Sequence, residues 1–392
     1  MKSFKLRPFK NFNTKRGFLY PKVIKEGKAV LDIEIPKVVS SKMGVFYNPK
    51  MRINRDITIF ILSKVSRNLR ICDPLGASGI RSLRILLELS NVKELIYNDI
   101  DKKACEFFRR MLSLNGLDSA PVKIYCADAS YLLGSIRGFD YIDIDPFGSP
   151  VGFLQSAIIS LNRHGLLAVS ATDTSVLSGT YPQVCKRRYG ASPLLEAEFY
   201  HEIGLRILIK RVIEEGAKLD FAMRPLLAYS HLHYMRAFFI KDIGSKRADA
   251  QTEKIGYILF CPSCIFRDRV SLDEIYTTCP ICSSRLKLAG PLWIGQILDR
   301  DILHQETNLP TISKEALRLL EMLKLESLKT SVGFYTIPAL CKKLKIPQPP
   351  PLHFLIDLLE GSRTHMHPQG IRTDLEPTEI IRRLSEWSLK SS

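Results

Sequence analysis

The residues best suited to chemistry lie in a short stretch at 141–148, with the sequence YIDIDPFG. Its alternating apolar residues predict a buried strand, and the Pro-Phe-Gly after it predicts a tight exit. The tip of that strand would carry the Asp145 carboxylate, the Pro146 carbonyl and the flat ring of Phe147. An exocyclic amino group of a nucleobase is a poor nucleophile, and two acceptors with a stacking ring would orient it for attack. A plain β-turn after a core strand is the alternative interpretation.

Upstream, residues 68–87 predict a strand, a small-residue turn and a helix, in that order. The strand ends at Asp73, Gly76 lies in the turn, and Arg81 stands in the first turn of the helix. This order is the start of a nucleotide-binding βα unit, in which glycines allow close backbone approach to a ligand. Gly76 and Gly79 do not make the G-x-G-x-x-G fingerprint of dinucleotide sites.

Two further predicted strands, at 94–99 and 122–128, also end in acids. Asp99 follows Gly76 at close to the ~20-residue offset at which an acid binds ribose hydroxyls. An acid at one strand end is an ordinary cap, but here four successive strands end in one: Asp73, Asp99, Asp128 and Asp145. Because ligands of open α/β sheets bind at the carboxyl ends of the strands, the row predicts one cleft for S-adenosylmethionine.

Together these segments resemble the tRNA guanine-26 N2-dimethyltransferase family, whose members place two methyl groups on one guanine amino group. The resemblance runs from about residue 26 to 375. The segments that carry it are FYNP (46–49), NRD (54–56), DPLGASGIR (73–81), DPFGSP (145–150), ATDT (171–174), GTYP (179–182), YSHLHY (229–234) and SRTH (362–365). It implies a class I S-adenosylmethionine-dependent RNA methyltransferase. The predicted fold is an α/β protein with a Rossmann-like seven-stranded domain, to which the residues discussed below add an inserted zinc ribbon and a smaller α+β C-terminal domain.

The resemblance and the glycine turn together give a predicted set of cofactor-binding residues. The set consists of Arg55, Asp73, Gly76, Arg81, Asp99, Asp128 and Ala129. The two arginines would face the methionine carboxylate, a task for which a forked guanidinium is suited. Asp99 would bind the ribose hydroxyls, and Asp128 would bind the adenine.

The predicted catalytic residues are Asp145, Pro146, Phe147 and Phe46. Asp145 and the Pro146 carbonyl would orient the guanine amino group, and Asp145 would accept its proton. Phe147 would stack on the base, with Phe46 on its other side, although Phe46 or its neighbour Tyr47 could instead be a core residue. An ionised Asp only accepts hydrogen bonds, which suits guanine, with its ring imino hydrogen beside the amino group, better than adenine.

The chain carries a net charge of +17, from 57 Lys and Arg against 40 Asp and Glu. Such an excess favours a polyanionic partner. Residues 1–28 mix basic and aromatic side chains with Glu26 as the one acid. They belong to a predicted basic extension, 1–40, that suits RNA contact; a disordered start or a transit-like peptide is the alternative. A second basic group, at 186–188, lies beside the predicted cleft.

Four of the nine cysteines form two C-x-x-C pairs, Cys261 with Cys264 and Cys279 with Cys282. Each pair presents two thiolates on one side of a knuckle, and two such pairs make a tetrahedral site for structural zinc. The segment 251–295 is therefore predicted to be zinc-ribbon-like. A disulfide pair or a degenerate ribbon is the alternative. The other cysteines are scattered singly and indicate a reducing compartment, which disfavours the disulfides.

The methyltransferase domain is expected over 41–250. Within it a helix is predicted from Ser192 as N-cap, with Pro193 as its first residue, to about Glu214. The resemblance adds a closing hairpin of two strands, at 218–229 and 233–240.

Residues 296–392 are predicted to form a C-terminal tRNA-binding domain. The segments 362–365 (SRTH) and 370–373 (GIRT) place Ser, Thr and Arg side chains in loops, where such groups suit contacts with phosphates. A mixed α/β accessory domain with a basic surface is the alternative.

The sequence shows no apolar run near the ~18 residues of a membrane span and no signal-peptide core. We therefore expect a cytoplasmic enzyme whose partner is tRNA, without membrane association and without an obligate protein partner. The rival interpretations are an amino-methyltransferase acting on rRNA guanine or DNA adenine, and a non-catalytic RNA-binding protein on the same scaffold.

Overall fold

A mixed seven-stranded sheet forms the centre of the computed structural model, which describes residues 22–33, 44–306 and 308–391. The strand order is β5-β4-β3-β6-β7-β9-β8. Neighbours from β5 to β7 pair in parallel, whereas β9 runs antiparallel to both β7 and β8. The strands are β3 (Leu69–Asp73), β4 (Val92–Asn98), β5 (Val122–Tyr125), β6 (Phe139–Ile144), β7 (Leu161–Ala171), β8 (Phe221–His231) and β9 (Tyr234–Ile243).

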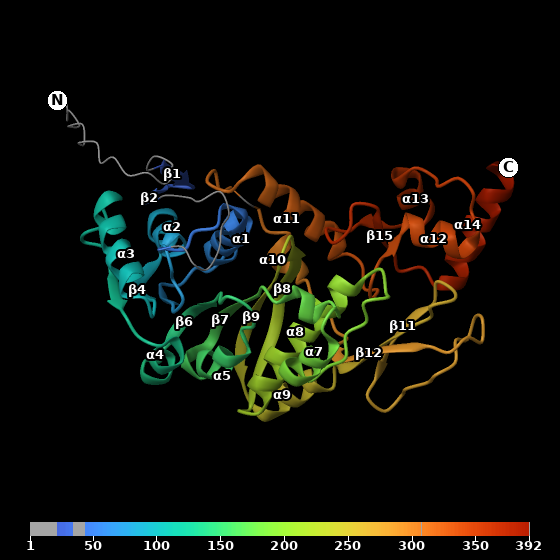
Figure 1. Ribbon diagram of the computed structural model, residues 1–392, viewed down its shortest axis with the longest axis horizontal. Coiled ribbons are helices and arrows are strands. Elements are labelled where there is room, and N and C mark those ends of the chain that lie inside the picture. The colour runs from blue at the N-terminus through green and yellow to red at the C-terminus, as the bar shows by residue number, and fades with distance from the viewer. Residues whose placement is uncertain (1–21, 34–43, 307, 392) are drawn as a thin grey trace, which may run out of the picture.

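Helices cover both faces of this sheet, as parallel strands require. In Figure 1, α1, α2 and α3 lie above the sheet, and α4, α5 and α8 lie below it. Their bounds are α1 (Arg52–Ser63), α2 (Ile80–Glu88), α3 (Lys102–Leu114), α4 (Ala129–Ser135), α5 (Val151–Ser160) and α8 (Tyr200–Ala217). The short elements η1 (Pro49–Met51), α6 (Thr174–Leu177), α7 (Pro182–Tyr189) and α9 (Ser245–Thr252) complete this part.

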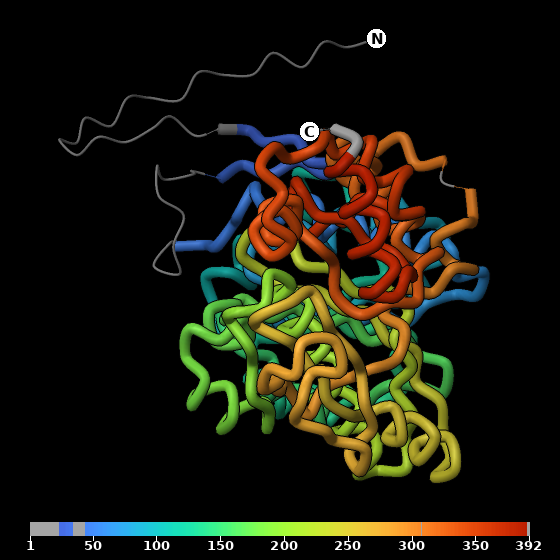
Figure 2. The backbone as a smooth tube through the Cα atoms, turned by 90° about the vertical axis from the view of Figure 1, so that its right-hand side faces the viewer, coloured from blue at the N-terminus to red at the C-terminus, as the bar shows by residue number. Residues whose placement is uncertain are grey.

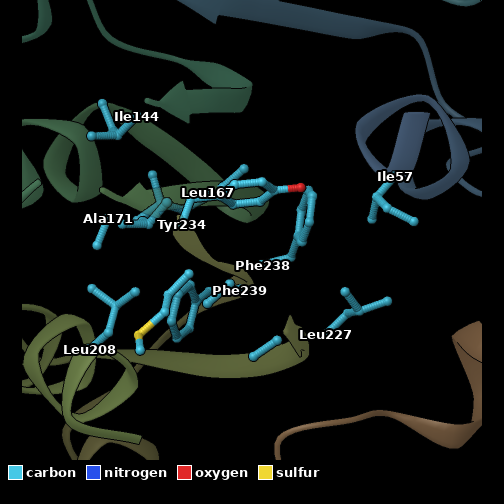
Figure 3. Packing of buried hydrophobic residues seen from close by; sticks show 14 of the residues in the cluster. Ile57, Ile144, Leu167, Ala171, Leu208, Leu227, Tyr234, Phe238 and Phe239 are labelled. Carbon is cyan, nitrogen blue, oxygen red and sulfur yellow. The ribbon is translucent and has the colours of Figure 1, made fainter. Parts of the chain in front are cut away.

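Strand β9 shows how the two faces become apolar. Phe238 points toward Ile57 of α1, and Phe239 points toward Leu208 of α8 (Figure 3). All four side chains are fully buried. Successive side chains of a strand point to opposite faces, so a continuous apolar run serves both helix layers.

The predicted helix from Ser192 to Glu214 is wrong at its start, because α8 begins at Tyr200. Ser192 instead exchanges two backbone hydrogen bonds with Gly290, each 2.8 Å long. Strand-like pairing with a residue almost a hundred positions away thus replaces the helix N-cap that the sequence Ser192-Pro193 favours. The predicted hairpin is confirmed as β8 and β9.

A second sheet, of order β11-β10-β12, carries the four-cysteine segment. Its strands are β10 (Ile255–Phe260), β11 (Arg267–Ser271) and β12 (Lys287–Trp293). Strand β12 packs on α8, and Ala289, Leu292 and Trp293 belong to the main hydrophobic core.

The C-terminal part forms a third sheet with helices around it. Its elements are α10 (Arg300–Leu303), α11 (Lys314–Glu326), β13 (Tyr335–Thr336), α12 (Ile337–Leu344), α13 (Leu352–Leu358), β14 (Ser362–Arg363), β15 (Gly370–Arg372) and α14 (Pro377–Ser391). Leu319 and Leu323 of α11 join the main core, whereas a separate core surrounds Leu340, Leu355 and Ile371. Figure 2 shows this red segment above the yellow and orange four-cysteine segment.

Of the predicted basic extension, 1–40, residues 1–21 and 34–40 lie outside the described residues. The hairpin of β1 (Lys22–Glu26) and β2 (Ala29–Ile33) packs on α2 and α3. Among the described residues, no helix has both the length and the apolar character needed to cross a membrane.

Candidate active site and metal centre

Asp145 follows directly after β6, where its side chain is 17% exposed, whereas that of Asp143 in the strand is fully buried. The turn after it is fixed to the end of β7, because Gly148 N donates to Thr172 Oγ1 at 2.6 Å and Thr172 N donates to the Gly148 carbonyl at 3.0 Å. Gly148 has φ +88°, a conformation that favours glycine. Within the described ranges no group donates to the Pro146 carbonyl.

Phe147 is 62% exposed, an unusual position for a large aromatic ring. Its ring meets Phe46 edge to face, with the centroids 4.6 Å apart. The neighbouring Tyr47 is buried, and its hydroxyl donates to Glu26 at 3.0 Å. Of the adjacent residues Phe46 and Tyr47, Phe46 is therefore the one whose ring contacts the ring of Phe147.

Arg81 is buried and engaged with acids. Its Nη2 donates to Asp145, its Nη1 lies 3.2 Å from Asp143, and Nη1 also donates to Asn54 at 2.8 Å. The predicted cofactor-binding arginine is thus in contact with the predicted catalytic acid.

Arg55 forms a two-pronged ion pair with Glu26, with Nε–Oε1 and Nη2–Oε2 distances of 2.6 Å each. Although burial opposes ionisation of Glu26, Arg55 and then Arg84 lower its pKa to about 2. The sequence interpretation missed this role of Glu26. The sequence signal that could have indicated this role is that Glu26 is the one acid among the basic residues 1–28.

Asp99 and Asp128 lie in the loops after β4 and β5. The Asp99 carboxylate accepts from Ala77 N and from Asp101 N, at 2.9 Å each, so it fastens the glycine turn. Asp128 caps α4 by accepting from Tyr131 N at 2.9 Å, which makes Ala129 the first residue of that helix.

Asn98 was not singled out from the sequence, yet its Nδ2 donates to the carbonyls of Pro74 and Ala127, at 2.9 Å each. It therefore ties together the loops that follow β3 and β5. An amide at the end of a strand gives too common a pattern to identify such a role.

Asp73 and Gly76 make structural contacts around the turn after β3. Asp73 accepts from Ser82 Oγ at 2.7 Å, and burial, helped by the nearby charges of Asp143 and Asp145 and opposed by Arg81, raises its pKa to about 6. At Gly76 a Cβ would lie 2.2 Å from the Tyr97 ring, so glycine is needed for packing.

The basic group at 186–188 is exposed on α7, which is linked to the turn after β6. Tyr189 donates to Asp173 at 2.7 Å and accepts from Ser149 Oγ at 2.9 Å. Ser149 lies four residues after Asp145, so this helix is anchored beside the candidate site.

Of the Ser, Thr and Arg side chains in SRTH and GIRT, Arg363 is exposed and the others are buried, so the two segments do not form the predicted phosphate-binding loops. Thr364 and Arg372 are buried, and both bind Glu326, at 3.0 and 3.3 Å. Arg372 also pairs with Glu202 of α8. Arg372 therefore holds the C-terminal part to α8, and the partners of both residues are too distant in sequence to be inferred from local composition.

The four cysteines of the two C-x-x-C pairs come together. Their sulfur atoms all lie within 4.8 Å of one another, with Cys261–Cys282 at 3.4 Å and Cys264–Cys279 at 3.6 Å. Tetrahedral coordination with Zn–S bonds of ~2.3 Å requires sulfur atoms about 3.8 Å apart, so the set fits a closed metal site. Lys343 of α12 donates to the Cys264 carbonyl at 2.7 Å.

Known proteins are similar to this chain over almost its entire length. A sequence profile described as N2,N2-dimethylguanosine tRNA methyltransferase matches residues 26–385. The tRNA (guanine(26)-N(2)/guanine(27)-N(2))-dimethyltransferase of Aquifex aeolicus is 43% identical, over 93% of this chain and 96% of that protein. The tRNA (guanine(26)-N(2))-dimethyltransferase of Methanosphaera stadtmanae is 36% identical, over 91% and 95%.

A solved structure agrees with the fold. Trm1 from Pyrococcus horikoshii, in complex with S-adenosyl-L-methionine, superposes with a TM-score of 0.80 at 32% identity, covering 92% of this chain and 99% of that one. The α/β fold, the strand-tip acids and the four-cysteine cluster thus occur in a chain that matches these proteins along nearly its full length. This chain belongs to the N2,N2-dimethylguanosine tRNA methyltransferase family.

Proposed function

We propose that this chain transfers one and then a second methyl group from S-adenosylmethionine to N2 of guanine 26 in tRNA. The observation that carries the proposal is the turn after β6. It sets the half-buried Asp145 beside the exposed Phe147, together with the Pro146 carbonyl, to which no described residue donates. The names of the relatives support the same reaction and the same substrate. Since tRNA is the substrate, the cytoplasm is the expected place of action.

The cofactor would bind at the loops after β3, β4 and β5. Asp128 is exposed and Asp99 is half-buried, so both carboxylates can meet a ligand. When bound, S-adenosylmethionine supplies a methyl group already activated by its sulfonium. The related Trm1 from Pyrococcus horikoshii, solved in complex with S-adenosyl-L-methionine, supports the assignment.

The protein's part in the reaction is to hold the base and its amino group. Phe147 would stack on the extruded guanine, and Asp145 and the Pro146 carbonyl would accept the two amino hydrogens. Asp145 then takes up the proton that the methylated nitrogen loses. In the second round, the remaining hydrogen is presented to the same acceptors.

Zinc is the proposed occupant of the four-cysteine cluster. Four thiolates leave no open coordination position, so the role is structural. The exposed Lys186, Arg187 and Arg188 on α7 are the proposed tRNA phosphate contacts nearest the site.

Transfer of labelled methyl groups tests the reaction class. The purified protein with labelled S-adenosylmethionine should label tRNA, and leave rRNA and duplex DNA unlabelled. Equal labelling of rRNA or DNA would contradict the assigned substrate. Absence of S-adenosylmethionine binding in calorimetry would contradict the enzyme assignment itself.

A further inference from the structure

A line of alternating charges runs from the middle of the sheet to the candidate site. It consists of Arg236 on β9, Asp143 on β6, Arg81 on α2 and Asp145 at the strand tip. The side chains of Arg236 and Asp143 are 0% exposed, that of Arg81 is 8% exposed and that of Asp145 is 17% exposed. The first two residues have no role in the proposed reaction.

The inner end of this line is rigidly built. Arg236 binds both carboxylate oxygens of Asp143, at 2.8 and 2.6 Å, in the forked geometry that fixes orientation. The same guanidinium donates to Ser170 Oγ at 2.8 Å and Thr58 Oγ1 at 2.9 Å. The Tyr141 hydroxyl also donates to Asp143.

At the outer end of the line, the buried Asp143 and Thr58 orient Arg81. Arg81 Nη1 lies 3.2 Å from Asp143 and donates to Thr58 Oγ1 at 3.0 Å, while Nη2 donates to Asp145. Thr58 of α1 therefore accepts from both arginines. The position of the Arg81 guanidinium, and with it the side that faces Asp145, depends on groups buried beneath the site.

Net stability is a weak explanation for such an arrangement. Removing charges from water costs several kcal/mol per ion, and apolar replacements of buried pairs are often as stable. Fixed geometry is what a buried ion network does provide, and methyl transfer requires it, because a displacement of ~1 Å at a reacting group can cost about a hundredfold in rate.

We propose that Asp143 and Arg236 are positioning residues for Asp145. They hold the Arg81 guanidinium in place, and Arg81 in turn keeps the Asp145 carboxylate oriented toward the amino group to be methylated. Neither residue touches the substrate. The inference rests on the proposed function, because it deepens the role given there to Asp145.

The test compares R236K with the milder variant Y141F. A lysine at position 236 keeps the positive charge. Its single ammonium group cannot bind both oxygens of Asp143 and also the hydroxyls of Ser170 and Thr58. We expect R236K to lower kcat by about tenfold or more, with KM for tRNA and affinity for S-adenosylmethionine within about twofold of wild type. Y141F removes one hydrogen bond to Asp143 and should lower kcat by a smaller factor.

R206K is the matched control. Arg206 is 3% exposed and pairs with Glu202 at 2.8 Å, so it is as buried and as charged as Arg236, but it lies on α8 and binds the Trp293 carbonyl. It should lose thermal stability like R236K and keep its kcat. Unchanged kcat in R236K, or an equal fall in kcat in both variants, would overturn the proposal.

Crystal structures of the wild type and R236K separate this proposal from the proposed function. The inference expects Asp145 to change its position or lose its contact with Arg81 in R236K. An unmoved Arg81–Asp145 pair would overturn it, whatever the activity. Wild-type protein inactive on tRNA would instead refute the proposed function, and the two crystal structures would still decide whether Arg236 positions Asp145.

Discussion

At the scale of single residues, the candidate site is a small number of acceptors and one exposed ring. Asp145 is accessible, whereas Asp143, two positions earlier, is fully buried between Arg236 and Arg81. Although burial favours the neutral acid, these two arginines lower the pKa of Asp143 below its ordinary value. Both acids contact Arg81, but Asp143 lies inside β6 and Asp145 lies just past its end, so the depth of each carboxylate sets its different task.

The substitution D145A tests the catalytic task. Without the carboxylate, the amino group loses an acceptor and its proton loses a destination, so kcat should fall by ~10²- to 10⁴-fold. Affinities for S-adenosylmethionine and tRNA should stay nearly unchanged in calorimetry. A matching loss of cofactor binding would show that Asp145 serves the cofactor instead.

Glu26 predicts how stability depends on pH. Its pKa falls from the ordinary 4.5 to about 2 in the folded chain, so its ion pairs contribute stability that is complete above pH 4.5 and lost as the pH falls toward 2. The contribution is about 3 kcal/mol. E26Q should be less stable at neutral pH and lose less stability between pH 4.5 and 2, measured by urea unfolding.

The control for this experiment is E106Q, which alters an acid that is 57% exposed. Its stability should follow the wild-type pH dependence. If E26Q and wild type lose stability in parallel between pH 4.5 and 2, Glu26 is not the group that titrates.

At the scale of elements, the four-cysteine segment is a second small sheet fastened on two sides. Strand β12 packs on α8, and Lys343 of α12 donates to the carbonyls of Cys261 and Cys264, at 3.3 and 2.7 Å. An ammonium group beside four thiolates would also offset their negative charge. The four-cysteine segment thus contacts both the main part of the protein, through α8, and the C-terminal part.

The double variant C261S with C264S should lose zinc and melt at a lower temperature, because a structural zinc site contributes directly to folding. Mass spectrometry under native conditions measures the metal content. C341S, which alters a cysteine outside the cluster, should keep one zinc ion. A full metal complement in the double variant would refute the proposed ligands.

Local patterns predicted elements whose signals lie within their own residues. The strand before Asp145 follows from its alternating apolar residues and the turn after it, whereas the hairpin of β8 and β9 was expected from the family resemblance. The start of α8 does not follow from local patterns, because Ser192 pairs with Gly290. The Arg81–Asp145 contact was missed for the same reason, since arginine in the first turn of a helix gives no sign of which acid it will meet.

At the scale of the whole molecule, the proposed tRNA contacts of α7 lie on the side where the parallel strands end. The α7 residues Lys186 and Arg187 are exposed, and α7 is tied to the turn after β6 through Tyr189 and Ser149. The C-terminal part is held to α8 by Glu202, whose pKa Arg372 and Arg206 lower to about 2 in spite of burial.

The double variant K186A with R187A should bind tRNA more weakly. Each lost phosphate contact should reduce the slope of log affinity against log salt by ~0.7 to 0.9, with S-adenosylmethionine affinity unchanged. Fluorescence anisotropy at several salt concentrations measures both effects.

The matched control is K93A with R137A. These two exposed residues lie near the N-terminal ends of β4 and β6, whereas the candidate site lies at the C-terminal ends of the strands. Their removal should leave the salt slope unchanged. An equal change of slope in both double variants would mean that the charge acts without a defined contact surface.

The most direct test of the proposed reaction is nucleoside mass spectrometry on a tRNA transcript treated with the protein and S-adenosylmethionine, beside a transcript with adenine in place of guanine 26. We expect N2,N2-dimethylguanosine in the first transcript and none in the second. Dimethylguanosine in both transcripts would support the reaction but show that it takes place at another guanine, such as guanine 27. No methylated guanine in either, with S-adenosylmethionine bound, would contradict the proposed reaction.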